Sequence, residues 1–268
     1  QRIGYIGTSL LLCGILSLIV IFAAGQELSF TLWSMTDVLT IYFRMDGISK
    51  VFAALTTFVW VIVGFYAFGY MKHEEEEEKF YRYYLIVYGV LLGLDFSGNL
   101  ISMYLFYELM TLSSLPLVLH SRTKEAVMAG LKYLFYSIAG AFLSLLAIFF
   151  FYQYGTTMEF TAGGVLDMAK VAGNEQVLLL VIFLAIVGFG CKAGMFPLHA
   201  WLPTAHPVAP SPASAVLSGI ITKAGVLAII RVVFYITGAD FIRGTWVQTT
   251  WLVLSLITVF MGSMLAFR

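Results

Sequence analysis

The feature that most constrains this chain is a series of apolar stretches, each about as long as a helix that crosses a lipid bilayer. A spanning helix needs about 20 predominantly apolar residues, because each residue advances the helix by about 1.5 Å. The sequence therefore predicts an all-α, polytopic transmembrane helix bundle with eight spans. Their expected limits are residues 3–24, 48–71, 80–96, 99–119, 128–152, 177–196, 211–236 and 246–267.

The composition agrees with a membrane protein and argues against several other classes. Hydrophobic residues make up 60% of the 268 residues and charged residues only 11%, whereas soluble domains carry about 25% charged residues. The formal net charge is zero, so the charge balance does not predict binding to nucleic acid. The two cysteines, Cys13 and Cys191, lack the spacing of a metal, iron–sulfur or haem site. We therefore predict neither a metal nor a redox cofactor in this chain.

Glycine and proline interrupt one of the predicted spans near residues 188–206. Gly188, Gly190 and Gly194 precede Pro197 and Pro203 in this segment. Such residues loosen or break a helix. Non-helical backbone at membrane depth is tolerated only where it is buried in protein or lines a water-filled cavity. The pattern therefore predicts a discontinuous helix beside an ion pathway.

Three of the ionisable residues inside predicted spans stand out as functional candidates: Glu108, Lys192 and Lys223. A charge at membrane depth costs several kcal/mol unless it is paired, hydrated or used, so each is a candidate functional residue. Facing glutamate and lysine side chains would stabilise each other's charge, and a second lysine nearby would favour proton release. We therefore hypothesise a proton relay through these three side chains.

Each of these residues also has a purely structural interpretation. A neutral Glu108 could hydrogen-bond to a neighbouring backbone group or to the hydroxyl group of Thr111, Ser113 or Ser114 on its own helix. Either lysine could extend its long side chain to the membrane surface. That explanation suits Lys192, which lies off the centre of its span, better than Lys223.

Two histidines, His199 and His206, flank the predicted break. Histidine changes charge near neutral pH and could connect a buried relay to water. Alternatively, both rings pack at helix ends and bond carbonyl groups that the prolines leave free. We predict no metal site, because no third type of ligand clusters with them.

Four further charged residues lie near the ends of predicted spans. Lys132 could join the relay on the inner side, although anchoring at the interface is the favoured interpretation. Arg231 is expected to reach the membrane surface with its long side chain. Asp46 and Asp95 stand at span ends and receive no assigned role.

Longer motifs around the break resemble those of a known family. They are Phe196-Pro-Leu-His-Ala-Trp-Leu-Pro-Thr-Ala-His206, Ala209-Pro-Ser-Pro-Ala-Ser-Ala-Val-Leu-Ser-Gly219 and Lys223-Ala-Gly225. Tyr107-Glu-Leu-Met110, Leu131-Lys-Tyr133 and Met45-Asp-Gly47 add shorter matches. Together these segments are similar to the proton-conducting antiporter-like membrane subunits of respiratory complex I, Mrp-type Na⁺/H⁺ antiporters and membrane-bound [NiFe] hydrogenases with their formate-linked relatives. The resemblance extends over the chain from about residue 45.

The resemblance implies a fold of about fourteen helices with two inverted five-helix repeats, each containing a broken helix. The eight spans would be helices 2–9, and residues 1–268 would form a single transmembrane domain from the N-terminal half, with the first repeat at about 80–236. By this match Glu108 is the glutamate of helix 5, Lys192 the lysine of broken helix 7 and Lys223 the lysine of helix 8. Thr204 stands where an aspartate is common.

The resemblance also implies a function. We expect a proton- or cation-translocating subunit of a redox-driven complex of quinone reductase or hydrogenase type, with the redox chemistry in other subunits. The alternative is a subunit of an Mrp-type cation/proton antiporter without redox coupling. Expected partners are other membrane subunits, the lipid bilayer and protons or sodium ions, in the cytoplasmic membrane of a prokaryote.

Overall fold

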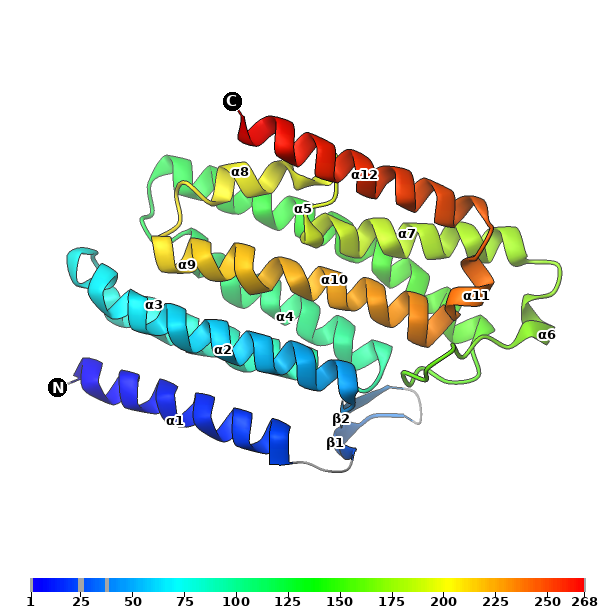
Figure 1. Ribbon diagram of the computed structural model, residues 1–268, viewed down its shortest axis with the longest axis horizontal. Helices are drawn as coiled ribbons and strands as arrows, with labels where there is room; N and C mark the ends of the chain where they lie inside the picture. The colour runs from blue at the N-terminus through cyan, green and yellow to red at the C-terminus, as the bar shows by residue number, and fades with distance from the viewer. Residues whose placement is uncertain (1, 24–26, 37–38, 268) are drawn as a thin grey trace.

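Long helices that run back and forth between two ends dominate the computed structural model, which describes residues 2–23, 27–36 and 39–267. Predicted span limits at residue 24 lie outside this part of the chain. Figure 1 shows the helices lying side by side in antiparallel succession. They are α1 (Arg2–Ala23), α2 (Gly47–Tyr70), α3 (Glu77–Asp95), α4 (Leu100–Val118), α5 (Lys124–Tyr154), α7 (Glu175–Ala193), the composite helix from α9 (Ser211–Val216) to the π-helical segment η4 (Arg231–Thr237), and α12 (Trp246–Ala266).

The predicted all-α, polytopic fold is confirmed. In the described part of the chain, seven helices are long and apolar enough to cross a membrane. The remaining predicted span, 80–96, forms helix α3 almost at its expected limits. Helix α3 is not one of these seven apolar helices, because its first two turns carry Glu77, Glu78, Lys79 and Arg82. It nevertheless packs between α2 and α4.

A β-hairpin precedes α2, and the sequence analysis did not predict it. Strand β1 (Leu28–Ser34) pairs antiparallel with β2 (Thr40–Met45), and Leu28 lies opposite Met45. Strand β2 is tied to the α3–α4 turn, since Gly98 N–H donates to the Tyr42 carbonyl at 2.9 Å. The alternation of apolar and polar residues along β1 has the period of a strand, and this pattern could have predicted the hairpin.

The bundle has two ends, and several helices begin at capped positions at one or the other. We call the end with β1, β2, the 155–174 connection and α11 (Ala239–Ile242) the hairpin end; the opposite end carries the short helix η1 (Met71–His73) (Figure 1). At the hairpin end, Asp46 caps α2 by accepting from Ser49 N–H at 2.9 Å, and Asn99 caps α4 by accepting from Ser102 N–H at 2.7 Å. Such caps satisfy amide groups that a helix start leaves free.

Helices α5 and α7 approach each other closely through small residues. A Cβ atom on Gly188 would lie 2.5 Å from the Gly140 carbonyl oxygen and 2.6 Å from Ser144 Oγ. Small residues allow this contact between membrane helices, where packing rather than hydrophobicity drives association. The close approach brings the end of α7 against side chains of α5.

Substitution of Gly188 by alanine is expected to destabilise the protein. The added methyl group overlaps backbone of α5 that cannot move away, so we expect the free energy of unfolding to fall by about 1–3 kcal/mol. Thermal unfolding in detergent measures the change. Gly89→Ala is the matched control, because its Cβ meets no atom within 4 Å and alanine is the better helix former. Equal stability of the two variants would contradict the packing argument.

Candidate functional site

The predicted break in the helix is present, and it lies midway along the bundle (Figure 1). Helix α7 ends at Ala193 and its cap, Gly194, has a φ of 82° in the left-handed region that favours glycine. A 3₁₀ turn, η2 (Leu198–Trp201), and the short helix α8 (Leu202–Ala205) continue the chain. A side chain at Gly194 would also contact Leu202 at 2.7 Å.

The backbone groups at the break find partners within the protein. Met195 N–H donates to the Gly190 carbonyl at 2.9 Å, and Trp201 Nε1 donates to the Cys191 carbonyl at 3.0 Å. Phe196 N–H donates to Thr258 Oγ1 of α12 at 3.0 Å. Because these groups are satisfied by protein, the open turn can persist at membrane depth.

Lys192, one residue before the end of α7, is held in what we call the hydroxyl cage: Thr111, Tyr133 and Ser137. Its ammonium group donates to Thr111 Oγ1 at 2.8 Å, Tyr133 OH at 3.0 Å and Ser137 Oγ at 2.9 Å. The residue is 1% exposed. Its nitrogen also lies 4.5 Å from the centre of the Tyr133 ring and 5.6 Å from that of Tyr107, which favours the positive charge.

The hydroxyl cage uses the full donor capacity of a lysine ammonium group, which is three bonds. Thr111 comes from α4, whereas Tyr133 and Ser137 lie one turn apart on α5. Ser114 shares a 2.7 Å hydrogen bond with Tyr133 OH and thereby orients that ring. Within residues 2–23, 27–36 and 39–267 no carboxylate forms an ion pair with Lys192, so its bonded partners are neutral.

Glu108 is half-buried on α4, three residues before Thr111 of the cage. Its Oε1 is buried without a hydrogen-bond partner in the described structure. The serines that could have bonded Glu108 donate to backbone carbonyls, Ser113 to Met110 and Ser114 to Thr111. In the described structure, these two hydroxyl groups therefore donate to the backbone and not to Glu108.

The other predicted relay lysines are not brought to the cage. Lys223 is exposed on α10 (Thr222–Ile230), where its ammonium donates to the Ser218 carbonyl at 2.5 Å. Lys132 is half-buried on α5 and lines a shallow groove with Thr204 and Val208. Neither side chain shares a partner with Lys192 in the described structure.

The two histidines lie at different points beyond the break. His199 is half-buried in η2, its ring stacks on Phe196 at 5.5 Å, and its Nδ1 is buried without a partner in the part of the chain that the structure describes. His206 is half-buried, and its Nδ1 lies 2.6 Å from Ser214 Oγ. It borders a groove with Tyr70 and Ser218. The partners described for the two rings, Phe196 and Ser214, do not belong to the cage.

Sequence reasoning missed Tyr133 and Ser137 as partners of Lys192. The signal was available, because Tyr133, Ser137, Gly140 and Ser144 recur at helical spacing and so share one polar, small-residue face. It also misplaced Arg231, which is 1% exposed and does not reach the membrane surface.

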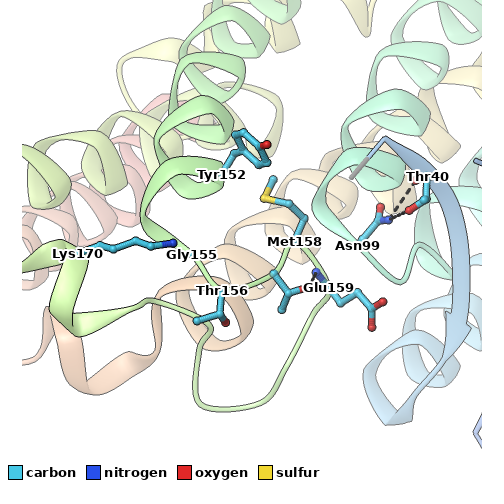
Figure 2. Close-up of a pocket in the computed structure, with 9 residues that line it drawn as sticks. Thr40, Asn99, Tyr152, Gly155, Thr156, Met158, Glu159 and Lys170 are labelled. Carbon is cyan, nitrogen blue, oxygen red and sulfur yellow. Dashed lines mark hydrogen bonds between the residues drawn. The ribbon is translucent and has the colours of Figure 1, made fainter. Parts of the chain in front are cut away.

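A polar recess of about 350 Å³ lies at the hairpin end (Figure 2). Its lining includes Thr40, Asn99 and Tyr152 together with two charged residues, Glu159 and Lys170, whose side chains are exposed. None of the residues around Lys192 lines it. The recess is therefore separate from the candidate site.

Comparison with known protein families shows to which family the chain belongs. The family described as "NADH:quinone oxidoreductase/Mrp antiporter, TM" matches residues 97–268, which is more than half of the sequence. The chain belongs to this antiporter-like family. A second family, described as "NADH-Ubiquinone oxidoreductase (complex I), chain 5 N-terminus", matches residues 33–84. The predicted family resemblance is thereby confirmed, and the chain is an integral membrane protein.

Curated relatives of the antiporter-like family include proteins of both expected kinds. Hydrogenase-4 component B of Escherichia coli is 32% identical over 194 residues, which is 70% of this chain and 28% of that protein. A Na⁺/H⁺ antiporter subunit of Alkalihalophilus pseudofirmus is 29% identical over 220 residues, 81% of this chain and 43% of that protein. The chain thus spans less than half the length of these relatives.

Solved structures share the fold. A chain of the membrane-bound sulfane sulfur reductase, an archaeal respiratory membrane complex, matches with a TM-score of 0.73 at 20% identity. The match covers 94% of this chain and 50% of that one. A chain of the Mrp complex from Dietzia sp. matches with a TM-score of 0.68 at 22% identity, over 87% of this chain and 44% of that one.

Proposed function

We propose that this chain translocates protons or another cation across the membrane as a subunit of a larger complex, with Lys192 and Glu108 at the centre of the pathway. The observation that carries the proposal is the buried Lys192 ammonium group, which is held at a helix break by neutral hydroxyl groups. A lysine in such a position can lose its proton without leaving a broken ion pair behind. Intramembrane ionisable residues of this kind mark ion pathways.

Glu108 supplies the second half of the proposed relay. Its unpartnered buried oxygen can accept a proton or turn towards the ammonium group of Lys192. Glu108 lies about one helical turn before Thr111, which accepts a hydrogen bond from that ammonium group. When the two charges approach, the ammonium form of Lys192 is favoured; when they separate, its proton is released. The glutamate would thus control the charge of the lysine.

The remaining predicted residues would extend the relay away from Lys192 and Glu108. His199 and His206, beyond the break, would connect it to water, and Lys132 would be an accessory member or an interface anchor. The exposed side chain of Lys223 would be the point where the relay passes to another part of the protein or to a partner subunit.

We also propose that residues 1–268 form a single transmembrane domain whose first repeat spans about 80–236. This domain would lie in a prokaryotic cytoplasmic membrane.

Coupling to a redox reaction in partner subunits is the favoured form of this function. It is supported by the similarity to hydrogenase-4 component B and to a chain of an archaeal respiratory complex. The Mrp-type alternative is supported by the similarity to Na⁺/H⁺ antiporter subunits. Purification of the complex from its native membrane separates the two. Hydrogenase or quinone-reductase subunits would support the first form, and other Mrp-type subunits the second.

Glu108→Gln tests the relay within the complete complex. Glutamine keeps the size of the side chain but cannot gain or lose a proton as a carboxyl group does, so we expect ion transport to slow by about 100-fold or more, as when a positioned proton-transfer group is lost. Transport is measured in membrane vesicles with a pH-sensitive dye. The matched control is Glu74→Gln in the exposed turn at the other end of the bundle. Parent-level transport in the Glu108 variant would reject the role of this carboxyl group.

A further inference from the structure

A second cluster of buried charges lies at the hairpin end, away from the hydroxyl cage. Arg231, at the start of η4, donates to both carboxylate oxygens of Asp46, at 2.5 and 2.9 Å, and to Ser49 Oγ at 2.9 Å. The Phe160 and Tyr235 rings each lie 4.7 Å from its guanidinium carbon. The Asp46 carboxylate thus neutralises the Arg231 charge in a fixed geometry.

Asp95, the last residue of α3, lies in the same region with far less support. It is 3% exposed, and its one hydrogen bond in the described structure is donated by Thr56 Oγ1 of α2 to Oδ2 at 2.8 Å. The chain beyond it is covered by β2, since Arg44 N–H donates to the Phe96 carbonyl at 2.8 Å. An ionised carboxylate can accept about four hydrogen bonds, so Asp95 has fewer partners in the described structure than its charged form can use.

The other charged groups at this end of the bundle come from three elements. Arg44 belongs to β2, Asp46 caps α2, and Arg231 begins η4; Arg44 lies 4.0 Å from the carboxylate of Asp46. The positive charge of Arg231 acts on both Asp46 and Asp95. Because Arg231 is already paired, Asp95 experiences its field without forming an ion pair of its own. It can therefore gain or lose a proton without disrupting the pair.

We propose that Asp95 is a further proton-carrying residue of this chain, at the hairpin end of the bundle, and that the Arg231–Asp46 pair holds its surroundings in place. The step is a simple exchange: the carboxylate takes one proton from water or from the relay to form O–H, and that bond later breaks to release the proton. This inference rests on the proposed ion-translocating function. It adds a residue for which the sequence analysis assigned no role.

The isosteric variant Asp95→Asn separates proton transfer from structure. An asparagine oxygen still accepts the Thr56 hydrogen bond, so a structural role alone predicts unchanged transport. We expect transport in vesicles of the complete complex to fall by about 100-fold or more, and Asp95→Glu to restore part of it. Asp240→Asn is the control, because Asp240 pairs with Arg243 at the surface. Parent-level transport in Asp95→Asn would overturn the proposal.

A second readout compares the parent protein with Asp95→Glu, and it does not require the asparagine variant to fold. Infrared difference spectra of the purified complex, recorded as a function of pH, should contain the C=O band of a protonated carboxyl group that moves in Asp95→Glu. A spectrum in which no band responds to this substitution would also overturn the proposal. The Lys192→Met variant keeps the two hypotheses apart. Lost transport in that variant, with full transport in Asp95→Asn, would reject the Asp95 inference alone.

Discussion

Lys192→Met is expected to abolish ion translocation while leaving the protein folded. Methionine has a similar length and no charge, so it fits beside Tyr107 and Tyr133 without the cost of burying an ammonium group. Removal of a positioned proton-transfer group slows such a step by about 100-fold or more. Pumping and chemical turnover of the complex are measured separately, with a pH-sensitive dye and an electron acceptor.

Two further variants make the Lys192 experiment specific. Lys124→Met removes an exposed lysine at the start of α5 and should leave transport unchanged. Tyr133→Phe removes one of the three hydroxyl partners and should reduce transport less than Lys192→Met, because Thr111 and Ser137 remain. If pumping persists at the parent level in Lys192→Met, the assignment of the relay is wrong.

Arg231→Met is expected to cause the largest loss of stability of any single substitution considered. It leaves the Asp46 carboxylate buried without its partner, and loss of one member of a buried ion pair costs about 3–5 kcal/mol. The temperature of unfolding in detergent should fall accordingly. Arg243→Met is the matched control: its partner Asp240 is exposed, with a side-chain exposure of 90%, and such surface pairs contribute about 1 kcal/mol or less.

A double variant distinguishes the unpaired charge from lost packing. In Asp46→Asn/Arg231→Met, asparagine remains a good helix cap for α2, and both charges of the Arg231–Asp46 pair are gone. The double variant should therefore be more stable than Arg231→Met alone. If it is equally unstable, the packing of Arg231 between Phe160 and Tyr235 matters more than its charge.

The pH dependence of stability follows from the same pair. Burial raises the pKa of the Asp46 carboxyl, but the hydrogen bond and charge of Arg231 outweigh it and hold the pKa below its usual range. A carboxyl group with a lowered pKa in the folded protein stabilises the fold above its unfolded pKa and loses that contribution as the pH falls through the folded value. The destabilisation by Arg231→Met should therefore be largest at neutral pH and shrink in acid.

The sequence alone determined where the helices and the break lie, because apolar length and the positions of glycine and proline act over a few neighbouring residues. The 188–206 segment thus predicted the interruption at Gly194. The sequence also placed Glu108 and Lys192 at membrane depth. It could not identify their partners, since hydrogen bonds across a bundle depend on how each helix is rotated against its neighbours.

Only the tertiary structure decided which charged side chains meet. Lys192 reaches hydroxyl groups of α4 and α5 because glycines let α7 approach, while Lys223 on the next long helix is exposed. Arg231 pairs with Asp46, which is 185 positions away in the chain, and local sequence carries no information about such a contact. A buried charge selects a partner by three-dimensional proximity, because the cost of leaving it unpaired exceeds any local preference of the chain.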